Sequence, residues 1–97
     1  MLRHVVLFGW SEDSTAGQRE RVAAELSTLP SLLPAIRSYQ FGPDAGINAA
    51  SWDFAVVADF DDVDSYRSYR DDPRHRAIID QHITPITARR ASVQYEF

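Results

Sequence analysis

Cysteine is absent from this sequence of 97 residues. Its absence excludes disulfide bonds, a thiolate nucleophile and a thiolate metal site. Lysine is absent as well, because all 10 basic residues other than histidine are arginine, so Schiff-base chemistry on a lysine amine is also excluded. This chain therefore cannot use two frequent kinds of covalent catalysis, that of a cysteine thiolate and that of a lysine Schiff base.

Long apolar runs are missing too. No segment approaches the roughly 20 apolar residues that span a bilayer, and the first residues lead into a strand-like segment rather than a secretion signal. We therefore expect no membrane partner and a cytoplasmic location. The net charge of −4 and the pI of about 5.2 also argue against a nucleic-acid partner, because phosphate backbones are bound by clustered positive charge.

The composition is that of one small globular domain. Hydrophobic residues make up 44% of the chain and charged residues 25%, which is typical of a protein with a packed core. A chain of this length fits a single domain covering residues 1–97. Such a domain buries only about 60–70% of the surface that its unfolded chain exposes, so a second subunit would add stability.

Alternating apolar residues predict four strands. Residues 2–10 carry apolar side chains on both faces, which predicts a strand that is covered on two sides. Residues 36–41 alternate and are followed by Gly42-Pro43, a turn signal. The same alternation predicts two further strands, at residues 52–60 and 89–97.

A first helix is predicted to begin after Thr15. Thr15 and Gln18 have the spacing of a capping box, and apolar residues then recur on one helical face. We expect this helix to end near Pro30 and Pro34, because proline interrupts the backbone hydrogen bonds of a helix interior. The predicted apolar stripe consists of Val22, Leu26, Leu29 and Leu33.

Two more helices are predicted on either side of Pro73. Aspartates at positions 61, 62 and 64 suit the positive end of a helix dipole and predict the start of the earlier helix, which carries Tyr66 and Tyr69. Pro73 ends that helix and can occupy the first position of the next one, with Asp72 as its N-cap. The stripe of the later helix consists of His75, Ile78, Ile79, His82 and Ile86.

The order of these elements predicts the fold. Strand, helix, strand, strand, helices, strand is the split β-α-β pattern of a ferredoxin-like α+β domain. Right-handed crossovers place all helices on one face of a four-stranded antiparallel sheet. The opposite face is then apolar and uncovered, and a second copy of the same sheet is the simplest cover. We therefore expect a homodimer.

Four short motifs follow one another along the chain. They are the strand His4-Val-Val-Leu-Phe8, the loop Gly46-Ile-Asn48, the strand end Ala58-Asp-Phe60 and the sequence Tyr69-x-x-x-Pro73-x-His75 before an amphipathic helix. In this order the chain resembles the stress-responsive dimeric alpha/beta-barrel family. One departure is Asp72, since the family often has histidine directly before the proline.

The resemblance implies a homodimer in which two sheets pack face to face as a closed α+β barrel, with a cleft between sheet and helices in each subunit. It extends to polyketide cyclases of the olivetolic acid cyclase type, which close a ring by an intramolecular aldol reaction and need no cofactor. Their tyrosine and histidine correspond to Tyr69 and His75, our candidate catalytic residues. The candidate substrate-binding residues are His4, Phe8, Tyr66 and Ile79.

Tyr69 and His75 suit proton transfer next to a carbonyl group. A neutral histidine can take a proton from the neighbouring carbon, and a tyrosine hydroxyl can donate to the enolate oxygen that develops. A bend at Pro73 would turn both side chains into one cavity. The structural alternative is that Tyr69 is an aromatic residue at the edge of the core and that His75 is bonded to a backbone carbonyl.

No metal site is expected. Val63 stands at the third ligand position of an EF-hand counted from Asp59, so the acidic cluster is interpreted as charge at a helix start. His75 and His82 are two helical turns apart, about 10 Å, which is too far for a shared metal ion. The interpreted acidic cluster consists of Asp59, Asp61, Asp62 and Asp64.

Three functions remain open from the residues. The first is binding of a small apolar carbonyl or aromatic molecule, with cyclase-like or isomerase-like proton transfer. The second is a non-catalytic stress-response or structural protein. The third is a cofactor-independent monooxygenase of a related dimeric barrel group, which also uses residue types found at Asn48, Trp52 and His75.

Overall fold

A computed structural model describes residues 1–97. Its four strands form one antiparallel sheet in the order β2-β3-β1-β4, with β1 (Leu2–Trp10) and β3 (Phe54–Phe60) in the centre. β2 (Ser38–Pro43) and β4 (Thr87–Glu96) are the edge strands. This strand order confirms the ferredoxin-like α+β fold predicted from the order of the elements.

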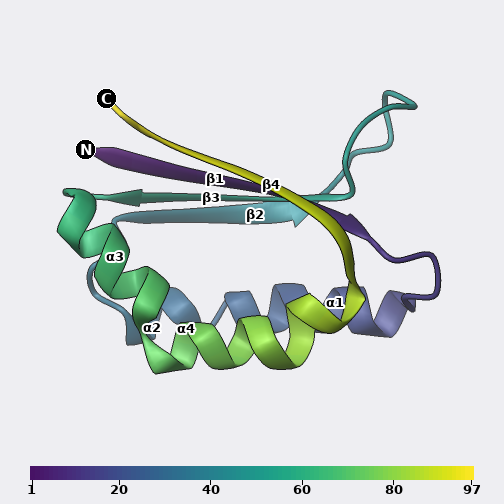
Figure 1. Cartoon of the computed structure of the whole chain (residues 1–97), viewed down its shortest axis with the longest axis horizontal. Coiled ribbons are helices and arrows are strands. Elements are labelled where there is room, and N and C mark those ends of the chain that lie inside the picture. The colour runs from purple at the N-terminus through teal and green to yellow at the C-terminus, as the bar shows by residue number, and fades with distance from the viewer.

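All helices cover one face of the sheet, as Figure 1 shows. No helix is both long enough and apolar enough to cross a membrane. In chain order the helical segments are α1 (Ala16–Leu26), α2 (Leu29–Leu32), α3 (Val63–Asp71), α4 (Pro73–Ile78), a π-helical segment η1 (Ile79–Ile83) and a 3-10 turn η2 (Thr84–Ile86).

The start of α1 is the predicted one, but its end is not. The Thr15 hydroxyl accepts a hydrogen bond from the Gln18 backbone at 3.1 Å, and the Gln18 side chain accepts one from the Thr15 backbone at 2.9 Å. The prediction that Pro30 ends this helix was wrong: Pro30 lies in the first turn of α2, where a missing N–H costs no hydrogen bond. The apolar stripe is nevertheless buried along both helices: Val22, Leu26, Leu29 and Leu33.

Strand ends also differ from the prediction. β2 continues through Pro43, which pairs with Phe54, because the outer side of an edge strand needs no N–H donor. Trp52 lies before β3 rather than inside it, and the Arg89 guanidinium packs 4.2 Å from its ring centroid. The core is unaffected by these shifts, since alternate residues of β3 still face the helices.

The centre of the sheet face away from the helices is apolar, with the Arg3–Asp59 ion pair toward one end and Arg89 toward the other. Val5 lies between Val57 and Val93 in the register, and Leu7 lies between two alanines. Of these, Val93 is 55% exposed. No helix covers this side of the sheet, and only the loop between β2 and β3 rises there, at one end (Figure 1). We call this surface the outer sheet face; it consists of Val5, Leu7, Ala55, Val57, Ala91 and Val93.

Candidate functional site

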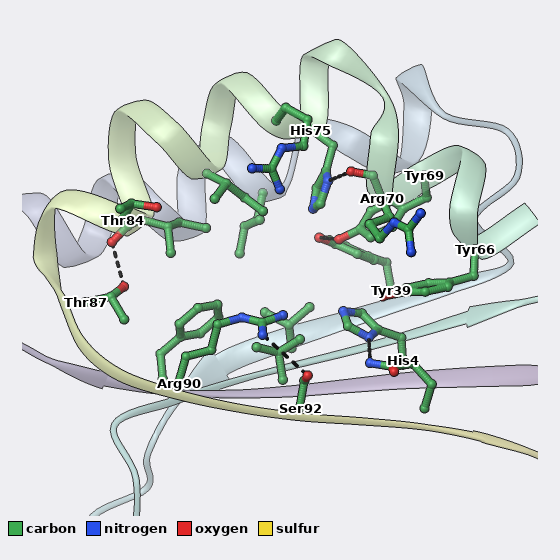
Figure 2. Close-up of a pocket in the computed structure, with 18 residues that line it drawn as sticks. His4, Tyr39, Tyr66, Tyr69, Arg70, His75, Thr84, Thr87, Arg90 and Ser92 are labelled. Atoms are coloured by element: carbon green, nitrogen blue, oxygen red, sulfur yellow. Dashed lines mark hydrogen bonds between the residues drawn. The ribbon is translucent and has the colours of Figure 1, made fainter.

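A cavity of about 580 Å³ lies between the sheet and the helices. This volume is in the range of pockets that hold small molecules. All six residues predicted for the site line it, and Figure 2 shows several of them facing each other across it. They are the candidate catalytic residues His75 and Tyr69 and the candidate substrate-binding residues His4, Phe8, Tyr66 and Ile79.

A break between α3 and α4 brings the two candidate catalytic residues together. Asp72 is extended there and caps α4, with its carboxylate accepting a hydrogen bond from the Arg74 backbone at 2.8 Å. Pro73 opens α4 at a position that needs no N–H donor. As a result the rings of Tyr69 and His75 lie 4.1 Å apart, centroid to centroid.

The hydrogen bond of His75 determines which ring nitrogen carries its proton. Nδ1 lies 3.1 Å from the backbone oxygen of Arg70. A carbonyl oxygen can only accept, so Nδ1–H is the donor and Nε2 of the neutral ring has a free lone pair. Figure 2 shows this nitrogen directed into the cavity. The backbone bond anticipated as the structural alternative is therefore present, and it orients His75 as a proton acceptor.

His4 has the opposite tautomer. Its partner in the β1–β4 register is Gln94, whose amide nitrogen lies 2.8 Å from His4 Nδ1. An amide nitrogen can only donate, so Nδ1 accepts and Nε2 carries the proton of the neutral ring. His4 is 5% exposed and packs against Tyr66, with ring centroids 4.8 Å apart. The cavity thus has an acceptor at His75 and a donor at His4.

Tyr69 is part of a pair of tyrosines. Its hydroxyl oxygen lies 2.9 Å from that of Tyr39, and its ring packs against Phe60. Tyr39 was missing from the sequence-based prediction. The alternation of side chains along β2 indicated which face of the sheet Tyr39 occupies. Only the pairing of Tyr39 with Ala58 in β3 places Tyr39 at the cavity.

Burial sets the protonation of the two histidines. Burial, helped by the positive charge of Arg90, lowers the pKa of His4 from its ordinary value of 6.5 to about 4. Burial likewise lowers the pKa of His75, against the opposing effect of its bond to the Arg70 carbonyl. Both imidazoles are therefore neutral at pH 7.

Burial acts on the tyrosines in the other direction. It raises the pKa of Tyr39 to about 12. It also raises the pKa of Tyr69, and Tyr39 and Tyr66 beside it add to that effect. Both hydroxyls therefore keep their protons at pH 7 and can donate to a ligand.

A pH-dependent loss of stability is expected from His4. Above about pH 6.5 the residue is neutral in both states, whereas at lower pH the unfolded chain takes a proton that the folded protein refuses until about pH 4. Stability therefore falls as the pH falls through this window, by about 2 kcal/mol at pH 5. Urea unfolding at about pH 7 and about pH 5 measures the loss.

The matched variant is His4→Asn, whose side-chain oxygen can still accept the hydrogen bond from Gln94. The variant should lose about 2 kcal/mol less than the wild type over the same pH interval. Other groups titrate in both proteins, so they cancel in the comparison. Equal losses in the two proteins would contradict the assignment of a neutral, buried His4.

The predicted acidic cluster divides into separate structural roles. Asp59 forms a bidentate ion pair with Arg3, at 2.7 and 2.9 Å, and Asp61 pairs with Arg37. Asp62 accepts from the Ser65 backbone at the start of α3. No group of three or more histidine or acidic side chains is placed to hold a metal ion.

His82 lies outside the cavity. Its Nε2 is 3.9 Å from a carboxylate oxygen of Glu25 on α1. It shares a helical stripe with His75 in the sequence, but the two side chains do not contribute to one site. The π-helical segment η1, which contains His82, turns Ile79 and Ile83 to the cavity.

The fold and this cavity define a ferredoxin-like domain with a buried histidine and tyrosine site beside the sheet. The chain belongs to the family described as the Stress responsive A/B Barrel Domain, which it matches over residues 2–97. The resemblance to this family seen in the sequence is thereby confirmed. A comparison with curated proteins gives no match.

Solved structures share the fold over almost the whole chain. A dimeric ferredoxin-like protein of unknown function from Thermobifida fusca is 44% identical, with a TM-score of 0.92 over 99% of this chain and 90% of that one. Hydroxynitrile lyase from Passiflora edulis is 17% identical, with a TM-score of 0.84 over 97% and 90%. A putative antibiotic biosynthesis monooxygenase from Nitrosomonas europaea is 13% identical, with a TM-score of 0.80 over 100% and 98%. The last two likenesses show the fold alone.

Proposed function

We propose that this protein binds a small carbonyl or aromatic molecule in the cavity and catalyses proton transfer at a carbon next to a carbonyl group, as polyketide cyclases do, without a cofactor. The observation that carries the proposal is the pairing of the free Nε2 of neutral His75 with the protonated hydroxyl of Tyr69 in one buried cavity. An acceptor and a donor side by side are what enolisation requires.

In the proposed step, His75 Nε2 takes a proton from the carbon next to the carbonyl. The electron pair of that C–H bond forms the enolate, and the enolate oxygen accepts a hydrogen bond from Tyr69. When Tyr39 donates to Tyr69, the Tyr69 proton is free for this bond. The enolate carbon can then attack a second carbonyl of the same molecule, and the new alkoxide receives the proton from His75.

Burial helps His75 to give up the proton that it has taken. The charged imidazolium is disfavoured in the cavity, which lowers the pKa of His75, so the proton returns to the product rather than remaining on the enzyme. The Nε2–H group of His4 is a further donor toward the ligand oxygen.

We also propose that the protein is a homodimer closed through the outer sheet face, and that it works in the cytoplasm. Support for the dimer comes from the uncovered apolar residues of that face and from related structures that are described as dimeric, from Thermobifida fusca, Bacteroides fragilis and Jannaschia. Two such faces packed together would bury their valines and leucine from water.

Hydrogen exchange tests the proposed chemistry without knowledge of the natural substrate. With acetophenone in D₂O, the wild type should speed deuteration of the methyl group above the rate in buffer, as followed by NMR. The exchange reports proton removal next to a carbonyl and needs no second substrate. Binding of acetophenone without any exchange above buffer would contradict the catalytic proposal.

A non-catalytic stress-response protein is the second candidate. One observation favours it: no polar side-chain atom that is fully shielded from solvent lacks a hydrogen-bond partner, so the protein interior needs no ligand to satisfy it. His75 Nε2 has no partner, but it faces the open cavity. Binding without exchange, as above, would support it. Consumption of dioxygen with a phenol would instead support the monooxygenase alternative.

A further inference from the structure

The charge of the cavity is opposite to that of the whole protein. The chain has 14 acidic residues and 10 arginines, a net charge of −4. Among the 18 residues that line the cavity, however, there is no aspartate or glutamate. The charged side chains of the lining are the three arginines Arg70, Arg76 and Arg90.

Two of these arginines are paired with carboxylates. Arg70 donates to both oxygens of Asp71, at 2.8 and 3.0 Å. Arg76 lies 3.7 Å from a carboxylate oxygen of Asp80, one helical turn away. Their positive charges are therefore largely balanced by the protein itself.

Arg90 has no such partner. No carboxylate lies within ion-pair distance of it, and its one side-chain hydrogen bond is a long one, 3.4 Å, to the Ser92 hydroxyl. Arg90 pairs with Phe8 in the β1–β4 register and therefore lies on the cavity face of β4. Figure 2 shows its guanidinium reaching into the cavity from the sheet side, while His75 lies on the helix side.

The neighbouring arginine provides a contrast. Arg89 lies one position earlier on β4 and packs over the Trp52 ring, away from the cavity. Its guanidinium thus already has an aromatic partner. Of two adjacent arginines of the same strand, only Arg90 offers an unbalanced charge to a ligand.

We infer that the cavity selects an anionic ligand, a mostly apolar molecule with one carboxylate that binds the Arg90 guanidinium. A guanidinium matches a planar carboxylate with two parallel hydrogen bonds, and the apolar walls suit an aromatic or aliphatic body. That the ligand also places a carbonyl group near Tyr69 and His75, on the other side of the cavity, rests on the proposed function. The selection of an anion does not depend on it.

The inference is tested with 4-acetylbenzoate and 4-acetylbenzamide, which have the same shape and the same aryl ketone but differ in charge. Isothermal titration should show the wild type binding the carboxylate about tenfold more tightly than the amide. In Arg90→Gln this preference should vanish while the affinity for the amide stays the same. Added salt should weaken the wild-type preference, because Arg90 is exposed.

Arg89→Gln is the matched control, because it removes the same charge from the adjacent position of β4. This variant should keep the preference for the carboxylate. Arg90→Lys should keep part of it, because a lysine retains the charge but not the planar fork. Equal binding of both probes by the wild type, no binding of either, or an unchanged preference in Arg90→Gln would each overturn the inference.

The same probes separate this inference from the proposed function. Both carry a methyl ketone whose deuteration can be followed by NMR. Carboxylate binding that depends on Arg90, without deuteration above buffer, would uphold anion selection and contradict catalysis. Deuteration of both probes at equal affinity would uphold catalysis and overturn anion selection.

Discussion

Replacing His75 with asparagine is expected to lower the exchange rate of acetophenone by at least about 100-fold, the usual contribution of a general base. The asparagine amide can still donate to the Arg70 carbonyl from the position of Nδ1, but nothing replaces the Nε2 lone pair. The fold and ligand affinity should therefore change little. NMR exchange rates, urea unfolding and titration with acetophenone measure the three quantities.

His82→Asn is the control for this prediction. His82 is the same residue type and lies two turns further along the chain, outside the cavity. Its replacement should leave the exchange rate within about twofold of the wild type. A rate for His75→Asn that stays near the wild-type rate, in a protein that folds and binds normally, would remove His75 as the base.

Tyr69→Phe extends the same experiment to the proposed donor. The enolate oxygen would lose its hydrogen bond, and loss of one such donor costs about 100-fold in rate. Tyr39 would lose its own partner at the same time, so some loss of stability is expected, about 1 kcal/mol. If the rate falls only in proportion to the folded fraction, Tyr69 acts as a structural residue.

Replacing Leu7 with aspartate is expected to separate the proposed dimer. Leu7 lies in the middle of the outer sheet face, between Ala55 and Ala91. A carboxylate there would be taken out of water among the apolar residues of two sheets, which costs several kcal/mol. Arg89 lies on the same face, but its guanidinium is already packed over the Trp52 ring. Sedimentation should show a wild-type dimer and a variant monomer at micromolar concentration, with the variant about 3 kcal/mol less stable.

Leu32→Asp is the matched control, since it makes the same leucine-to-aspartate change in α2, on the other side of the molecule. Leu32 is 43% exposed, and Figure 1 shows α2 in the helix layer, away from the outer sheet face. Its replacement should change neither the dimer nor the stability by more than about 0.5 kcal/mol. A wild-type monomer, or a Leu7→Asp dimer, would show that the outer sheet face is not the interface.

Short-range patterns determined much of this protein in advance. The capping box at Thr15 and the Asp72-Pro73 break depend on residues within three positions of each other, so they can be predicted from the chain alone. The order of strands and helices predicted the ferredoxin-like sheet because right-handed crossovers leave few alternatives. Tyr69 and His75 were predicted as a pair from the resemblance to the family, and the break at Pro73 made it possible for both side chains to enter one cavity.

Other features depended on segments that are distant in sequence. The end of α1 at Leu26 was not predicted, because the apolar stripe continues into α2 with the same spacing. The periodicity of apolar residues does not reveal a break between two helices when the stripe stays buried across it. Tyr39 and Arg90 reached the cavity through edge strands whose register depends on the whole sheet.

The sequence by itself thus determined the residue types of the site, which are histidines and tyrosines. It also determined the absence of cysteine and lysine. The tertiary structure decided the chemical states of the site residues. The proton of His4 is on Nε2 because Gln94, 90 positions away, donates to Nδ1, and Arg90 is unbalanced because no acidic residue from any element reaches it. Tautomer, burial and charge balance depend on which groups meet in space, and only the folded chain brings these groups together.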